Sequence, residues 1–197
     1  MAEKEEKKER LIVPREQYLT AGAHIGMAFK SAGMRKFIYK IRSNGLAVLN
    51  IGMLDKRIGC AAEMIARAKN PMIVCRKEIG WDAVSKFGEV TGTRVKTSRF
   101  MPGSLTNPSY EDYFEPDLLI IVDPLVDRQA MKEAVSSRVP IIGLADTSHD
   151  TAYLDLVIPC NNKGKKSLAL VFWAIASEIK KKKGEQFDLK MEDFGWE

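Results

Sequence analysis

The chain has 197 residues, 45% hydrophobic and 29% charged, and its 31 Lys and Arg against 26 Asp and Glu give a formal net charge of +5. These values are ordinary for one soluble globular domain, and three widely spaced cysteines support neither a disulfide framework nor a zinc site. No apolar run reaches the roughly 18 residues of a membrane span, and the charged first ten residues lack a signal peptide's apolar core. We therefore expect a cytoplasmic protein without a membrane partner.

The N-terminal part is predicted to contain a small helix and a hairpin. Residues 1–10 are nearly all charged and are expected to be disordered. A short helix is predicted over residues 15–23. Two apolar runs, 37–41 and 46–49, flank a turn with Asn-Gly at 44–45, which is a strong hairpin signal.

From residue 52 onward, apolar runs of strand length alternate with apolar residues at helical spacing. The predicted order is a helix over 54–68, a strand over 72–75, a helix over 83–90, a strand over 94–97, a strand over 118–122, a helix over 130–135, a strand within 139–145, a short strand at 157–158 and a helix over 168–179 that ends in four lysines. Continuous apolar strands between helices are typical of parallel sheets buried on both faces. The sequence therefore predicts one α/β domain over residues 11–183, a doubly wound parallel sheet of about five strands with helices on both faces.

The last residues, 184–197, form a tail with more apolar residues than a solvent-exposed tail without contacts would carry. It carries Phe187, Phe194 and Trp196 among acidic residues. We expect this tail to dock, and we assign these three aromatic side chains to contacts with a protein partner.

Three stretches of the chain contain basic residues but no acidic ones. The first lies between Glu16 and Asp55, the second runs from Val90 to Tyr110, and the third runs from 156 to 177. A surface of one sign attracts a polyanion, so the three windows point first to nucleic acid. The alternative is three solvated faces without a partner.

Motifs for nucleotide or metal chemistry are weak. The glycines of segment 22–26 have the wrong spacing for a dinucleotide fingerprint, and segment 164–167, Gly-Lys-Lys-Ser, lacks the first glycine of a P-loop. No catalytic constellation is found. We therefore expect neither enzymatic activity, nor a cofactor, nor a small-molecule substrate.

Four carboxylates follow two of the predicted strands, Asp123, Asp127, Asp146 and Asp150. Together at one rim they would repel a phosphate, but they could hold Mg²⁺ as in phospho-receiver domains. We favour turns and a helix cap, with Asp127 as the N-cap of the helix that starts at residue 128.

Several segments resemble one protein family. Residues 18–26 (YLTAGAHIG) look like the N-terminal signature of the second small-subunit ribosomal protein, S two, also called laminin-receptor-like in eukaryotes. Residues 99–108 (RFMPGSLTNP) resemble its central motif. Residues 116–124 and 141–147 resemble its later strand-turn segments, and 158–167 is similar to the segment before its last helix. The motifs occur in the family's order.

The chain resembles the archaeal type of this family. The bacterial type inserts a long helical hairpin after the segment that matches 101–107, where this chain has no room for one. The eukaryotic type carries a long acidic C-terminal extension that this sequence does not show. The resemblance implies a flavodoxin-like sheet with a small N-terminal appendage. It also implies a structural constituent of the small ribosomal subunit, which contacts ribosomal RNA and neighbouring ribosomal proteins in translation and subunit assembly.

The basic windows supply candidate RNA contacts, together with residues that could stack on a base or approach the backbone closely. The candidates are His24, Lys30, Arg35, Lys36, Tyr39, Lys40, Arg42, Arg94, Lys96, Arg99, Asn107, Lys163, Lys165 and Lys166. A satisfied loop histidine is an equal alternative for His24. For Phe37 and Phe100, core packing is favoured over stacking on a base. Gly103 and Asn107 are chosen because both tolerate positive φ near RNA.

Overall fold

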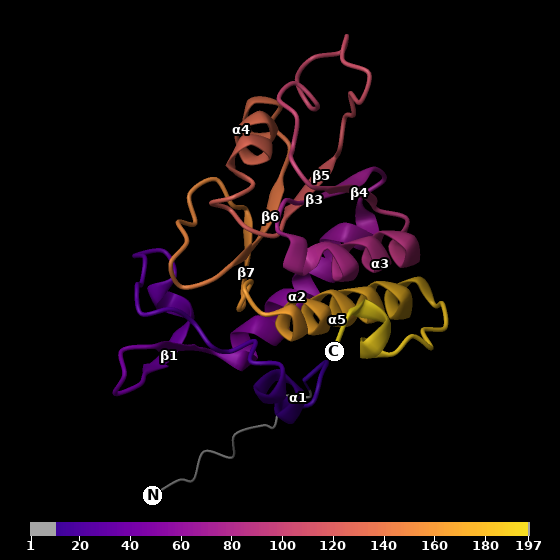
Figure 1. Ribbon diagram of the computed structural model, residues 1–197. Helices are drawn as coiled ribbons and strands as arrows, with labels where there is room; N and C mark the ends of the chain where they lie inside the picture. Colours follow the sequence, from indigo (N-terminus) through magenta and orange to yellow (C-terminus); the bar gives the residue numbers. More distant parts are fainter. Residues whose placement is uncertain (1–10, 197) are drawn as a thin grey trace, which may run out of the picture.

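A computed structural model describes residues 11–196, so the prediction of disorder for residues 1–10 lies outside the described residues. Figure 1 shows a sheet with helices packed on it and a hairpin that projects to one side. The α/β class predicted from the alternating apolar pattern is confirmed. Within residues 11–196, none of the helices combines the length and apolar character that a membrane crossing requires.

The central sheet has five parallel strands in the order β4-β3-β5-β6-β7. Their bounds are Pro71–Cys75 for β3, Arg94–Thr97 for β4, Leu118–Ile121 for β5, Ile141–Ala145 for β6 and Leu156–Pro159 for β7. In sequence order this is 2-1-3-4-5, the flavodoxin-like arrangement, and it confirms the doubly wound prediction. Neighbouring strands are in register along their length, with Ile73 opposite both Val95 and Ile120.

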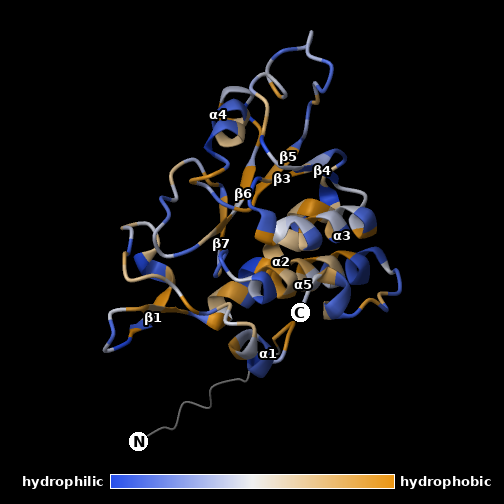
Figure 2. Ribbon diagram, viewed as in Figure 1, coloured by the Kyte–Doolittle hydropathy of each residue, from blue (hydrophilic) through white to orange (hydrophobic). Residues whose placement is uncertain are grey.

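Helices α2, α3 and α5 cover one face of the sheet, and α4 covers part of the other (Figure 1). They span Ile51–Arg67 (α2), Trp81–Thr91 (α3), Arg128–Ser136 (α4) and Lys165–Lys183 (α5), with a one-turn 3-10 helix, η2, at Glu78–Gly80. Alternate strand residues point to the two faces, so Ile142 packs with α2 and α5 whereas Ile141 packs with α4. Figure 2 shows the strands as a hydrophobic layer between these helices.

Helix ends follow the expected capping rules in two places. The Asn50 side chain begins α2 by accepting the backbone N–H groups of Gly52 and Met53. Gly92 ends α3 in the left-handed region at φ 75°, a conformation that glycine adopts readily at helix ends. The four lysines of the last turn of α5 lie at the negative end of that helix dipole.

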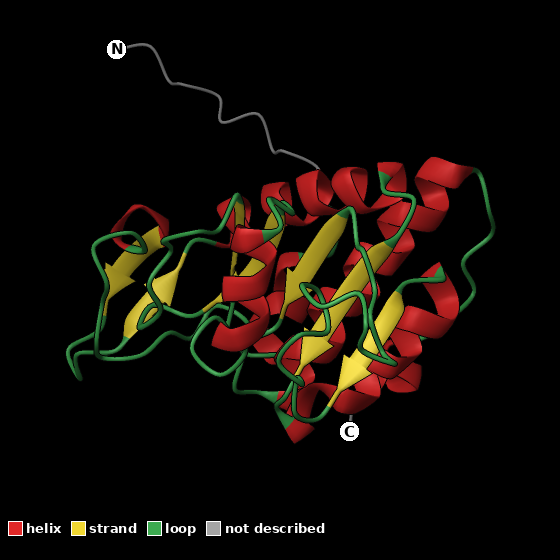
Figure 3. Cartoon of the chain, turned by 90° about the horizontal axis from the view of Figure 1, so that it is seen from above, coloured by secondary structure: helices red, strands yellow, loops and turns green. Residues whose placement is uncertain are grey.

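The N-terminal appendage comprises α1 (Arg15–Thr20), the 3-10 turn η1 (Arg35–Phe37) and the antiparallel hairpin β1 (Ile38–Ile41) and β2 (Ala47–Leu49). The predicted hairpin is confirmed. Figure 3 shows it beside the sheet rather than in it.

The appendage is attached at the carboxyl ends of β6 and β7. The Thr147 hydroxyl accepts the Met27 N–H at 2.8 Å, and the Thr147 carbonyl accepts the Ser31 N–H at 2.9 Å. Gly26 permits this contact because a Cβ there would lie 2.5 Å from the Thr147 methyl group. Phe37 fills the interface, fully buried against Val157 and neighbouring apolar residues.

The C-terminal tail folds back over α3 and α5 and includes the 3-10 turn η3 (Met191–Phe194). Phe194 is fully buried in the larger core. Phe187 packs against Trp173 with ring centroids 5.9 Å apart, and the Trp173 indole N–H donates to the Leu189 carbonyl at 2.8 Å. The tail therefore covers part of the protein's own surface.

Candidate nucleic-acid interface

The first basic window forms the outer surface of the appendage. Lys30, Arg35, Tyr39 and Lys40 line one shallow depression, together with Phe29. Phe29 is 68% exposed and Tyr39 is 65% exposed, so both aromatic rings are open to solvent among these cations. Large exposed aromatic rings next to Lys and Arg side chains can stack on bases while the cations pair with phosphates.

Phe37 packs in the core beneath this surface and helps to determine which side chains of β1 face solvent. It is fully buried, which confirms the core interpretation, and two cations lie over its ring. Lys36 Nζ is 5.1 Å and Arg57 Cζ is 4.8 Å from the ring centroid. The next residue, Ile38, is half-buried and Tyr39 points outward, so burial of Phe37 helps to set which side chains of β1 are exposed.

His24 lies inside the appendage and not on its surface. It is 6% exposed, and its Nδ1 lies 3.5 Å from the Tyr18 carbonyl oxygen. Burial lowers the pKa of His24 and the charge of Arg42 lowers it further, against the opposing effect of the Tyr18 carbonyl. This matches the alternative of a loop histidine with its own partner, and it leaves no free ring face for a base.

The second window lies at the opposite edge of the sheet, because β4 and β7 are the two edge strands. The Arg94 guanidinium stacks over the Phe114 ring at 4.5 Å, and Lys96 Nζ pairs with Asp112 at 2.9 Å. Arg99, after β4, is exposed. The structure therefore does not place Arg94 and Lys96 beside the appendage, and both already have partners within the chain.

The loop in the last part of the second window is tightly turned. Gly103 has a φ of 93°, as predicted, whereas Asn107 is not among the described residues with positive φ. The Asn107 side chain instead accepts the Ser109 N–H at 3.1 Å. Phe100 is 6% exposed, which agrees with core packing.

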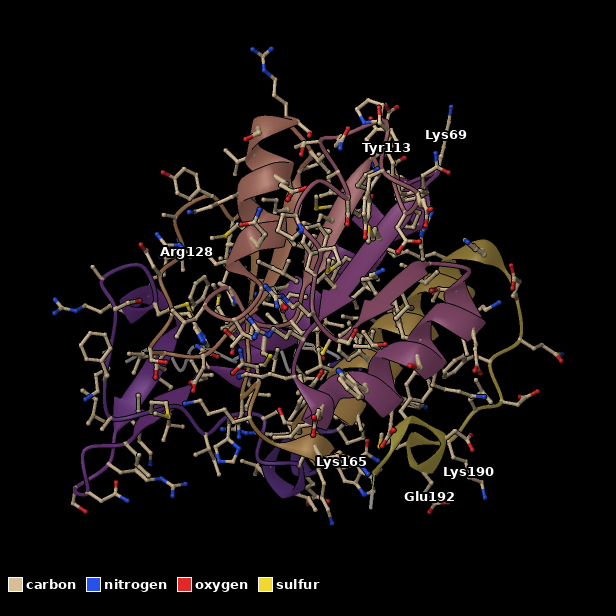
Figure 4. The ribbon with its side chains drawn as sticks, turned by 45° about the horizontal axis from the view of Figure 1, so that its top comes forward. Lys69, Tyr113, Arg128, Lys165, Lys190 and Glu192 are labelled. Atoms are coloured by element: carbon tan, nitrogen blue, oxygen red, sulfur yellow. The ribbon has the colours of Figure 1, made fainter. Side chains whose placement is uncertain are left out.

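The lysines of the third window border different parts of the protein: Lys163 lies beside the appendage and Lys165 beside the tail. Lys163 Nζ lies 2.9 Å from the Met27 sulfur, so this cation borders the appendage. Lys165 pairs with Asp82 at 3.1 Å, and its aliphatic stem lies beside Gly195 of the tail. Figure 4 shows Lys165 near the tail that carries Lys190 and Glu192.

Lys166 is exposed at the second position of α5. Lys163 thus adjoins the appendage, whose basic surface includes the exposed rings of Phe29 and Tyr39. The second window forms a separate one.

The tail aromatics predicted to contact a partner have different exposures. Phe194 has no exposed surface, so in this conformation it supports the tail rather than touching a partner directly. Phe187 and Trp196 are half-buried and retain some accessible surface.

The aspartates at the carboxyl ends of the strands form a buried network. The Asp123 carboxylate pairs with Lys77 and accepts from His149 Nε2 at 3.2 Å. His149 Nδ1 accepts the Asp146 backbone N–H at 2.9 Å, so in the neutral ring the proton is on Nε2. Burial alone would raise the pKa of Asp123, but the hydrogen bonds from His149 and Lys77 outweigh it and hold this pKa well below its usual range.

Asp127 occupies the N-cap position of α4, but the prediction that its side chain caps the helix is wrong. Its two carboxylate oxygens accept the backbone N–H groups of Arg76 at 3.1 Å and Asp123 at 3.2 Å, which join the ends of β3 and β5. Burial raises the pKa of Asp127 to about 6. Burial is also the largest cause of the raised pKa of Asp146.

The predicted turn at Asp123 is confirmed, because its carboxylate accepts the N–H groups of Leu125 and Val126. Asp150 is exposed and apart from this network. Among residues 11–196, no group of three or more His, Cys, Asp or Glu side chains is arranged to hold a metal ion. The aspartates are paired within the protein.

One surface residue of the appendage is missing from the candidates drawn from the sequence. Phe29 is a largely exposed apolar side chain that lines the depression beside Lys30. It lies in the first acid-free window, so the window identified the region, but a single phenylalanine in a sequence is more often a core residue.

Comparisons with known proteins agree on one family. The sequence model described as Ribosomal protein S2 matches residues 109–181. The chain is 42% identical over 193 residues to the small ribosomal subunit protein uS2 of Thermoplasma acidophilum, covering 94% of this chain and 97% of the relative. The uS2 of Thermoplasma volcanium is equally similar, at 42% identity over 193 residues. The uS2 of Staphylothermus marinus is 44% identical over 176 residues, with 88% and 80% of the two chains covered.

Proposed function

The chain belongs to the ribosomal protein S2 family, and on that premise we propose that it is a structural constituent of the small ribosomal subunit. In this role it binds ribosomal RNA and neighbouring ribosomal proteins during subunit assembly and translation. The single observation that best supports RNA contact is the appendage surface, where Phe29 and Tyr39 are exposed among Lys30, Arg35 and Lys40.

The chemistry of this surface suits structured RNA. Cations that pair with phosphates release counterions, so affinity falls steeply as salt rises. Double-helical RNA is met mainly through its backbone and 2′-hydroxyl groups, and unpaired bases stack on exposed aromatic rings. Tyr39 and Phe29 would take the stacking role, and Lys36 and Arg42 would extend the cationic surface along the hairpin.

The other candidate contacts fall into two groups with different support. Lys163 would extend the appendage surface, since it borders Met27, and Lys166 is exposed three residues later in the first turn of α5. Arg94, Lys96 and Asn107 would form a second contact at the far edge of the sheet. Lys165 is the weakest candidate because it already pairs with Asp82 and packs on the tail.

This function is structural and requires no catalytic group, and we propose a cytoplasmic location as part of the subunit. The buried aspartate network serves the fold in this account. Asp127 accepts backbone N–H groups at the ends of β3 and β5, and Asp123 accepts from His149, which in turn accepts the Asp146 N–H after β6. Half-exposed Phe187 and Trp196 are the tail residues best placed to contact a neighbouring protein.

A charge reversal on the appendage tests the proposal. The double variant Lys36→Glu and Arg42→Glu places two negative charges on exposed hairpin positions. We expect it to be depleted from small subunits while its Tm stays within about 3 °C of the unsubstituted protein, because surface substitutions change stability little.

The matched control is Lys69→Glu with Lys132→Glu, which makes the same change in net charge at exposed positions away from the appendage. Figure 4 shows Lys69 at the edge of the molecule far from the hairpin. Quantitative mass spectrometry of purified subunits compares the two. Equal incorporation of both variants would contradict the assignment of the appendage as an RNA contact.

A further inference from the structure

The carboxyl edge of the central sheet presents cations to solvent, although its sequence places four aspartates there. Asp123 and Asp127 are 1% and 2% exposed and are turned into the network described above. Arg76 follows β3 and Arg99 follows β4, and both are exposed at the same edge. Asp150 is exposed after β6, but at the ends of β3 and β4 a ligand meets two exposed arginines.

One small hollow is lined by Arg76, Arg99, Phe100, Pro102, Val126, Asp127 and Gln129. The Asp127 carboxylate is 2% exposed and accepts two backbone N–H groups, so the two arginines are the exposed charges of the hollow. The hollow lies where the loops after β3 and β4 meet the start of α4. Asp127 fixes the loop after β3 in place, because its carboxylate accepts the Arg76 backbone N–H at 3.1 Å. The position adjoins the point where the strand order reverses between β3 and β5, the usual ligand crevice of open α/β sheets.

Large aliphatic side chains are exposed on the three loops that form this hollow, residues 76–80, 98–103 and 123–129. Leu125 is 73% exposed, Ile79 is 46% exposed and Met101 is 42% exposed. Aliphatic side chains are also exposed elsewhere, as at Ile41 and Val135, but three of them on adjacent loops favour an interaction surface.

The chemistry of these loops differs from that of the appendage. Their one aromatic residue, Phe100, is buried, and their one lysine, Lys77, pairs with Asp123. Bases stack on aromatic rings and not on leucine or isoleucine, so this surface does not suit unpaired RNA. Arginine and methionine beside apolar residues, with lysine depleted, are instead typical of protein–protein interfaces.

Charge indicates the character of the partner. In these three loops the exposed arginines are Arg76, Arg99 and Arg128, whereas the exposed acid is Glu78. A guanidinium binds a carboxylate through two parallel hydrogen bonds, and such pairs become strong when the interface excludes water.

We propose that the hollow between the β4 loop and α4 is the docking site for an acidic segment of a neighbouring protein. The carboxylates of that segment pair with Arg76 and Arg99, and its apolar residues pack on Leu125, Met101 and Ile79. This inference rests on the proposed function, which places the chain in the small subunit beside other proteins.

Photocrosslinking in assembled subunits tests the site. Leu125 is replaced by p-benzoyl-L-phenylalanine, which its exposed position can accept, and subunits that contain this protein are purified and irradiated. The expected product resists nuclease, is cleaved by protease, and yields on mass spectrometry a crosslinked peptide rich in Asp or Glu. The same photoreactive residue at Val135, exposed at the other end of α4, is expected not to give this peptide.

A second variant tests the charge pairing. Arg76→Glu with Arg99→Glu should lower the yield of the Leu125 crosslink by about tenfold, since loss of a desolvated charge pair costs at least that much affinity. The control Lys69→Glu with Lys132→Glu should leave the yield unchanged. An undiminished yield in the arginine variant would overturn the proposed pairing.

Other results are equally decisive. A crosslink from position 125 to RNA, to a protein segment without acids, or to nothing would overturn the docking site and leave the proposed function intact. Absence of the protein from subunits altogether would overturn both.

Discussion

Truncating Phe194 provides a direct test of whether the C-terminal tail is part of the folded domain. The side chain is fully buried among apolar residues of the larger core, and its turn packs on α3 and α5. Phe194→Ala removes the ring from a fully buried site, and such a change in a core costs about 3–5 kcal/mol. For a chain of this size each kcal/mol lowers Tm by roughly 2–4 °C, so we expect a fall of at least about 6 °C.

Thermal unfolding monitored by circular dichroism measures this change, with Glu192→Ala as the matched control. Glu192 is exposed on the same turn, so its removal should shift Tm by less than about 2 °C. Trp173 gives a local readout, because its indole donates to the tail carbonyl of Leu189 and its fluorescence should shift to longer wavelength if the tail detaches. A Phe194→Ala protein with unchanged Tm and unchanged emission would refute the reasoning that the tail is anchored by this ring.

Three further outcomes are expected. The pKa of Asp127 is raised to about 6 by burial, so its contribution to stability is present at pH 4 and is lost as pH rises through 6. In urea unfolding, the wild type should therefore gain about 2 kcal/mol relative to Asp127→Asn between pH 7 and pH 4, and a constant difference would contradict this. Gly88→Ala should destabilise by about 1–3 kcal/mol, because the new Cβ would lie 2.2 Å from a β4 side chain; an unchanged Tm would show that β4 can shift. In native protein Cys60 alone is exposed, so a thiol reagent should modify one cysteine quickly and the other two only after unfolding.

The central sheet is largely predictable from the sequence because its signals are local. Each strand buried on both faces must be apolar at every position, and the run from 118 to 121 shows this directly. The helices between the strands show their apolar residues at helical spacing, and Asn-Gly marks the hairpin. These patterns depend on neighbouring residues in the chain, so the predicted elements agree with the structure to within a few residues.

The orientation of charged side chains is less predictable because it depends on contacts between distant segments. Asp127 stands at a helix start, but a loop 51 residues earlier in the chain supplies the N–H group that its carboxylate accepts. The second basic window follows β3 closely in sequence, yet strand order places it across the sheet from the appendage. The sequence could not show this, since the crossover order of parallel strands is not a local property.

Exposure of single aromatic residues shows the same limit. Phe37 and Phe29 lie in the same acid-free window, but one is fully buried and the other is 68% exposed. Packing of the hairpin on Thr147 and Val157, more than 100 residues later, decides which ring is covered. Composition identified the appendage as the basic region, and only the three-dimensional arrangement identifies the rings available to RNA.

The measurement that tests the central claim most directly is sedimentation of a native-cell lysate through sucrose gradients at low and high salt, with detection of this protein. A structural constituent of the small subunit should migrate with that subunit in a one-to-one ratio at low salt, and high salt should lower that ratio because its phosphate contacts weaken. Migration only at the top of the gradient under both conditions would contradict the account.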